Sequence, residues 1–161
     1  MSRVYRATRR GFFEPGLQRL VARANVLRGN AHGSGAGSIE EALESLFRPS
    51  ERLAVYGSLA PGRPNHHVIE DVVGSWTQGF VEGELFEIGW GAAIGYPAMR
   101  WIPGRGRIAV DVLISERLPG AWARLDAFEG PDYRRVLIPV FDNGGLLAVA
   151  NIYEARHERR A

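Results

Sequence analysis

The chain has 161 residues, of which 45% are hydrophobic and 24% charged, a balance typical of one soluble globular domain. It contains no cysteine, which excludes disulfides, thiol nucleophiles and cysteine-based zinc sites, and no apolar run approaches the roughly 20 residues that cross a bilayer. The net charge of +2 is uneven, because residues 1–30 carry seven arginines against Glu14 alone, and all 20 basic residues are arginine. This composition is weak support for a nucleic-acid partner.

The N-terminal segment differs from the rest of the chain. Residues 15–28 place apolar side chains at helical spacing with arginines on the other face, which predicts a short amphipathic helix. Three interpretations of this helix stay open: a solvated or loosely docked extension, a membrane-surface or transit-like segment, and a nucleic-acid-binding arm. The glycine- and serine-rich residues 29–38 then predict a flexible linker.

A second helix is predicted from Ser38 through Phe47. Ser38 and Glu41 match a capping box, in which each side chain accepts from a free backbone N–H of the first turn. Pro49 predicts that the helix ends just before it. We therefore divide the chain into a basic N-terminal extension, residues 1–50, and one domain, residues 51–161.

From residue 51 onward the pattern is mainly that of β-strands. Valine, isoleucine, leucine and aromatic side chains predict five strands, at residues 52–56, 76–88, 107–115, 133–141 and 146–154. The DNGG sequence between the last two strands predicts a hairpin. Helices are predicted at residues 66–73, with Asn65 as the cap, and at residues 119–129, ended by Gly130. The fold class is α+β: a small, closed or nearly closed, mostly antiparallel sheet with a few short helices.

Two histidines raise the possibility of a metal site. In the predicted helix His66 would lie four residues from Glu70, and His67 four residues from Asp71. Two ligands per face are too few for a metal, so pairing on the helix surface is the favoured interpretation.

Tyr56-Gly57-Ser58-Leu59 follows the first predicted strand. A strand that breaks at a glycine is either a plain turn or an array of backbone N–H groups that binds a carboxylate or a developing oxyanion. Ser58 is a poor candidate for a nucleophile, because no G-x-S-x-G motif surrounds it and no partner base is evident.

Glu129 lies in the last turn of the helix predicted at residues 119–129. Trp122, Leu125 and Phe128 are expected on one helix face, which would dock the helix on the sheet. The negative end of the helix dipole and partial burial would raise the pKa of Glu129 towards the range of a general base and acid. The alternative is that Asp126 and Glu129 are simply solvated acids.

These motifs together resemble a known family. The order strand-YGSL, then PGRPNHH, GYPAMR and LDAFEG, with Tyr133 and Arg134 following, resembles the γ-glutamylcyclotransferase superfamily. The likeness covers about residues 52–154 and is nearest to the branch with γ-glutamylamine cyclotransferases and AIG2-like proteins.

The resemblance implies a small β-barrel whose cavity holds a γ-glutamyl group, with no metal and no organic cofactor. By position, Glu129 matches the catalytic glutamate and Tyr133 an aromatic position near the pocket, while the substrate-binding loop matches Tyr56, Gly57, Ser58 and Leu59. The implied reaction is an intramolecular transfer, of the kind grouped with transferases and lyases, that gives 5-oxoproline and a free amine. The alternative is a non-catalytic protein of the same fold that binds γ-glutamyl ligands.

Several properties have no readable signature. The leaving amine and the oligomeric state stay open. A cytoplasmic location is expected by default, with a small-molecule substrate and without nucleic-acid or membrane partners.

Overall fold

The computed structural model describes residues 14–30, 36–87 and 97–156. The helices of this part are α1 (Glu14–Gly29), α2 (Ala36–Phe47) and α3 (Trp122–Glu129). The strands are β1 (Arg52–Val55), β2 (Ser75–Phe86), β3 (Ala98–Trp101), β4 (Arg107–Ile114), β5 (Tyr133–Asp142) and β6 (Gly145–Ala155). Single 3-10 turns occur at Pro49–Glu51, His66–Val68 and Leu118–Gly120.

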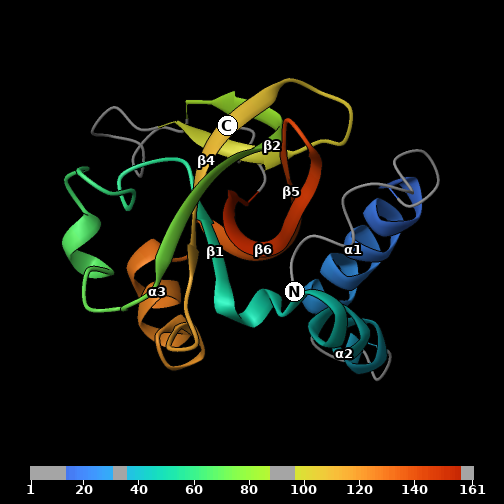
Figure 1. Ribbon diagram of the computed structural model, residues 1–161, viewed down its shortest axis with the longest axis horizontal. Coiled ribbons are helices and arrows are strands. Elements are labelled where there is room, and N and C mark those ends of the chain that lie inside the picture. The colour runs from blue at the N-terminus through green and yellow to red at the C-terminus, as the bar shows by residue number, and fades with distance from the viewer. Residues whose placement is uncertain (1–13, 31–35, 88–96, 157–161) are drawn as a thin grey trace.

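The strands form a six-stranded sheet in the order β3-β2-β4-β1-β6-β5. An additional pairing of β2 with β5 closes five of these strands into a barrel, to which β3 is added alongside β2 (Figure 1). The β1–β6 pair is parallel, and the other described pairs are antiparallel. The predicted fold class, a small, mostly antiparallel α+β barrel, is confirmed.

Two apolar layers explain why β5 is buried along most of its length. Val136, Ile138 and Val140 belong to the core inside the barrel, whereas Leu137 belongs to a second core shared with α1 and α2. Six consecutive buried residues, 136–141, result because both faces of this strand are covered. β6 follows the same rule.

The N-terminal helices pack on the outside of the barrel, on the β5 and β6 side (Figure 1). Leu17, Val21 and Leu43 are buried in the second core. The Asn25 side chain also pairs with the backbone of Leu137, donating to its carbonyl and accepting from its N–H, each at 2.8 Å. α1 is therefore docked on the barrel, while the domain boundary at residue 50 stays a prediction.

Three local predictions were wrong. α2 begins at Ala36, so Ser38 lies inside the helix and is not its cap. The helix predicted at residues 66–73 is only the turn His66–Val68, and Asn65 makes no capping bond because its amide donates to Ser58 Oγ instead. β3 was not predicted, since its four residues contain no β-branched side chain.

No helix in the described part of the chain is long and apolar enough to span a membrane.

Candidate active site

α3 places Glu129 at the edge of the barrel. Trp122 and Leu125 are buried beneath the helix, and the Trp122 indole donates to the carbonyl of Ser50 at 3.0 Å. Phe128 is 43% exposed, so the expected docking face contains only the first two apolar residues. Gly130 ends the helix with a φ of 74°, a conformation that favours glycine.

The loop after β1 is anchored by one side chain and braced by another. Leu59 is buried in the core, and Asn65 donates its amide to Ser58 Oγ at 2.8 Å and its N–H to the Ser58 carbonyl at 2.9 Å. His66 Nδ1 lies 2.9 Å from the carbonyl of Leu59. The loop is thereby fixed through its carbonyl groups.

The N–H groups of this loop are used differently from its carbonyls. The first loop N–H that donates to the described part of the chain is that of Ala60, which bonds the Gly57 carbonyl at 3.2 Å. The N–H groups of Gly57, Ser58 and Leu59 donate to no described residue. Three successive donors therefore stay available beside the cavity, as an anion-binding array requires.

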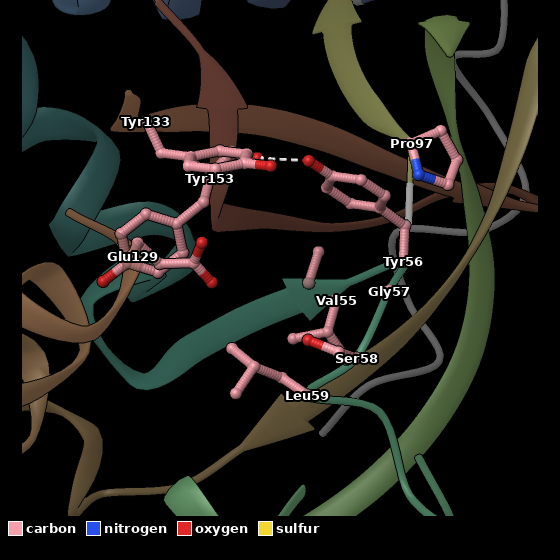
Figure 2. Close-up of a pocket in the computed structure, with 10 residues that line it drawn as sticks. Val55, Tyr56, Gly57, Ser58, Leu59, Pro97, Glu129, Tyr133 and Tyr153 are labelled. Atoms are coloured by element: carbon pink, nitrogen blue, oxygen red, sulfur yellow. Dashed lines mark hydrogen bonds between the residues drawn. The ribbon is translucent and has the colours of Figure 1, made fainter. Parts of the chain in front are cut away.

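One cavity of about 60 Å³ brings the predicted site residues together. Its lining includes all six of them: Tyr56, Gly57, Ser58, Leu59, Glu129 and Tyr133. Figure 2 shows Glu129 on one side of this pocket and the loop after β1 on another, with aromatic rings between them. The lining also contains Ala54, Val55, Pro97 and Tyr153.

The surroundings of the Glu129 carboxyl favour its protonated form. Burial raises its pKa to about 7, and no residue in the described ranges forms a hydrogen bond or ion pair with it. Burial, together with the nearby Glu129, also raises the pKa of Tyr133. A carboxyl with a pKa near neutral can both accept and return a proton at physiological pH.

Tyr56 has a structural task besides lining the pocket. Its hydroxyl donates to the Tyr153 carbonyl at 2.9 Å and accepts from the Met99 N–H at 3.2 Å. Burial, the largest effect, raises the pKa of this phenol. Tyr56 thereby ties β3 to β6 and fixes the wall from which Pro97 enters the cavity (Figure 2).

Sequence reasoning missed Tyr153 and Pro97 as lining residues. Tyr153 belongs to a strand that is buried without a break from residue 148 to 155, so the sequence pattern of β6 does not single it out. Pro97 is part of the GYPAMR motif, but no element was predicted there.

The interpretation of two histidine–acid pairs on a helix surface was wrong. The helix does not form, and Asp71 instead pairs with Arg124 through two hydrogen bonds, at 2.7 and 2.9 Å. The described residues contain no group of three or more histidine and acidic side chains arranged for a metal ion.

Gly57 is not required by the protein's own packing. Its φ lies outside the left-handed region, and a Cβ at this position would meet no described atom within 4 Å. Gly57 lines the pocket, so a side chain added there would find room without displacing a described atom.

We expect Gly57→Ala to fold like the parent but to bind substrate about tenfold or more weakly, because a methyl group blocks close approach to the loop backbone. Thermal unfolding and steady-state kinetics measure the two effects separately. Ser58→Ala should weaken binding less, since it retains the Ser58 N–H, although it removes the hydroxyl that accepts from Asn65. A larger loss for Ser58→Ala than for Gly57→Ala would contradict the backbone-binding role of the loop.

A family model and two solved structures are similar to this chain. The family model described as γ-glutamyl cyclotransferase, AIG2-like, matches residues 53–161. An AIG2-like protein from Mus musculus has a TM-score of 0.53 at 23% identity, over 68% of this chain and 80% of that chain, which shows a shared fold. YkqA from Bacillus subtilis has a TM-score of 0.50 at 26% identity, over 66% of this chain. This chain spans only 36% of YkqA. No curated protein matches.

Proposed function

This chain belongs to the AIG2-like γ-glutamyl cyclotransferase family, and from this premise we propose that it cyclises a γ-glutamyl amide or peptide to 5-oxoproline. The observation that carries the proposal is the position of Glu129. This carboxyl, with a pKa raised to about 7 by burial, shares a pocket with residues 57–59, whose N–H groups donate to no residue that the structure describes.

The first step is proton transfer. Glu129 in its charged form accepts a proton from the α-ammonium group of the substrate, and the resulting amine attacks the γ-carbonyl carbon. Because nucleophile and carbonyl belong to one molecule, the protein needs only to hold the substrate folded. No covalent intermediate with the protein is required.

The loop after β1 stabilises negative charge on the substrate. The N–H groups of Gly57, Ser58 and Leu59 hold substrate oxygen, either the α-carboxylate or the oxyanion of the tetrahedral intermediate. These donors need no rearrangement during the reaction, since their loop is already braced by Asn65.

Collapse of the intermediate completes the reaction. Glu129 returns its proton to the leaving nitrogen, and the bond between that nitrogen and the γ-carbon breaks. The attacking nitrogen loses a second proton as the lactam forms, and at neutral pH this proton ends on the released amine. The products are 5-oxoproline and the released amine in its protonated form.

Tyr133 completes the site as a substrate contact. Its ring lines the pocket, and its hydroxyl has no hydrogen-bond partner in the described part of the chain. We propose that the Tyr133 hydroxyl forms a hydrogen bond with a polar group of the substrate.

The direct test is to incubate the protein with γ-glutamyl amines, γ-glutamyl dipeptides and glutathione, and to measure 5-oxoproline. Release from at least one of these classes is expected. Binding of a γ-glutamyl compound with no release from any class would instead support the non-catalytic alternative. A cytoplasmic location and the absence of nucleic-acid and membrane partners stay predictions.

A further inference from the structure

Asp126 lies one turn before Glu129 on α3, and two strands hold its carboxylate. Tyr153 of β6 donates its hydroxyl to Asp126 Oδ1 at 2.6 Å. Arg135 of β5 donates to Oδ1 at 2.9 Å and to Oδ2 at 3.3 Å. The Asp126 side chain is 45% exposed, and these bonds join it to β5 and β6 one turn before the proposed base.

The guanidinium of Arg135 is itself held in place. It lies 4.5 Å from the centre of the Trp122 ring and donates to Asn151 Oδ1 at 3.3 Å. Asn151 is 1% exposed, donates to the Pro49 carbonyl at 2.7 Å and also accepts from Arg28 of α1 at 2.9 Å. This packing orients Arg135 towards Asp126 before any substrate binds.

Tyr153 has a single hydroxyl hydrogen, which it donates in a hydrogen bond to Asp126 Oδ1. Tyr153 lines the same pocket as Glu129, which is near enough to add to the effect of burial in raising the pKa of its phenol. A Tyr153 hydroxyl released from Asp126 would therefore have the Glu129 carboxylate as an acceptor in that pocket. Because the Tyr153 hydroxyl donates to Asp126, it donates no hydrogen bond to Glu129. A donated hydrogen bond favours the charged form of a carboxyl and weakens it as a base.

We propose that Asp126 and Arg135 are positioning residues, which fix α3 against the barrel and keep the Tyr153 hydroxyl directed away from Glu129. This inference rests on the proposed function, because it assigns the pair a task for the proposed base. Neither residue lines the pocket, so both act through Tyr153 and the helix.

The opposite charges of Asp126 and Arg135 give a measurable test, the pKa of Glu129 in variants that lack one of them. Burial alone raises the pKa of Glu129, and burial together with the nearby Glu129 raises the pKa values of three neighbouring phenols, Tyr56 after β1, Tyr133 of β5 and Tyr153 of β6. The other charged groups facing this cluster are Glu154 of β6, Arg135 of β5, Arg28 of α1 and Asp126 of α3. Partial burial raises the pKa of Asp126, but the hydrogen bonds from Arg135 and Tyr153 outweigh it, so this pKa lies below its ordinary value. Asp126 and Arg135 therefore both stay charged, and their charges balance.

Removing either partner should move the titration of Glu129 in opposite directions. Asp126→Asn leaves the positive charge of Arg135 unbalanced, which favours the charged form of Glu129. Arg135→Met leaves the negative charge of Asp126, which disfavours it. We expect shifts of roughly 0.3–1 pH unit, downward for Asp126→Asn and upward for Arg135→Met.

The experiment measures kcat/KM against pH with the best γ-glutamyl substrate, and follows the Glu129 carboxyl by ¹³C NMR titration, assigned with Glu129→Gln. Thermal unfolding establishes that each variant is folded. Arg135→Lys retains the charge without the forked pair, so its titration should return to that of the parent while kcat stays a few-fold lower. This variant also serves if Arg135→Met does not fold.

Asp71 and Arg124 supply the matched control, because they form another forked pair that joins α3 to the rest of the protein, on its exposed side. Asp71→Asn and Arg124→Met should leave the Glu129 titration unchanged. Equal titrations in the parent and both test variants, or shifts of the same sign, would overturn the proposal. If the parent releases no 5-oxoproline, the proposed function fails, while the NMR titration still decides the positioning role.

Discussion

Replacing Glu129 by glutamine should slow cyclisation about 100-fold or more while leaving substrate binding nearly unchanged. Glutamine keeps the shape of the side chain but can neither accept the α-ammonium proton nor return one to the leaving nitrogen. Steady-state kinetics should therefore show the loss in kcat, and equilibrium binding of the substrate should show little change. In the parent, kcat/KM should fall as the pH drops below about 7, because Glu129 then gains its proton.

The same variant should be more stable than the parent at neutral pH. The pKa of Glu129 is about 7 in the folded protein, above its ordinary value of 4.5, so the folded state binds more protons between these values. The contribution of this group to stability is complete below pH 4.5 and is lost as the pH rises through 7. Glu129→Gln should remove this loss, which is at most about 3 kcal/mol in the free energy of unfolding.

Glu116→Gln is the matched control, since Glu116 is an exposed residue just before α3. It should change neither turnover nor the pH dependence of stability. Turnover by Glu129→Gln near the parent rate would rule out proton transfer by this residue, and a stability profile parallel to that of the parent would rule out its raised pKa.

Deleting residues 1–48 should cost several kcal/mol of stability, a large part of the roughly 5–15 kcal/mol typical of a folded domain. The deletion removes the buried side chains of α1 and α2 and exposes Leu137 and Val149 of the barrel. It also leaves the N–H and carbonyl of Leu137 without the Asn25 side chain. Chemical denaturation measures the loss.

Turnover per folded molecule should nevertheless stay within a few-fold of the parent, because no described residue before 54 lines the pocket. Deletion of residues 1–13 is the control, since it retains α1 and every contact described above. Asn25→Ala should reproduce only the hydrogen-bond part of the loss. A truncation at residue 48 that is as stable as the parent would mean that α1 and α2 contribute nothing to the barrel.

The sequence predicted the barrel strands well because each one carries a local signal. In β4 buried residues alternate with more exposed ones from residue 107 to 112, as the sequence RIAVDV predicts. Local patterns failed where a distant contact decides the structure. Asn65 bonds Ser58 instead of capping a helix. β3 pairs with β2, and the N–H groups of Met99 and Trp101 donate to Tyr56 and Glu154.

The site was predictable in part for the same reason. Glu129 is distinguished by its place at the end of a helix, and the loop after β1 by its glycine, so both could be identified in the sequence. The bond from Tyr153 to Asp126 joins residues on different elements, and nothing in either local sequence indicates it. The sequence also does not reveal that the three N–H groups of the loop donate to no residue in the described ranges, because this depends on how the loop folds.

The seam of the barrel has a consequence for its motions. β2 and β5 pair at a single position, Phe80 with Phe141. The centroids of these two rings lie 5.9 Å apart. Closing a loop between strands so distant in the chain costs entropy, and one residue pair offsets little of it. We expect the amide hydrogens of this seam to exchange sooner than those of the long β2–β4 and β5–β6 ladders, which hydrogen–deuterium exchange would measure. Neither strand residue of the seam lines the Glu129 pocket, so the barrel can open there while the site keeps its geometry.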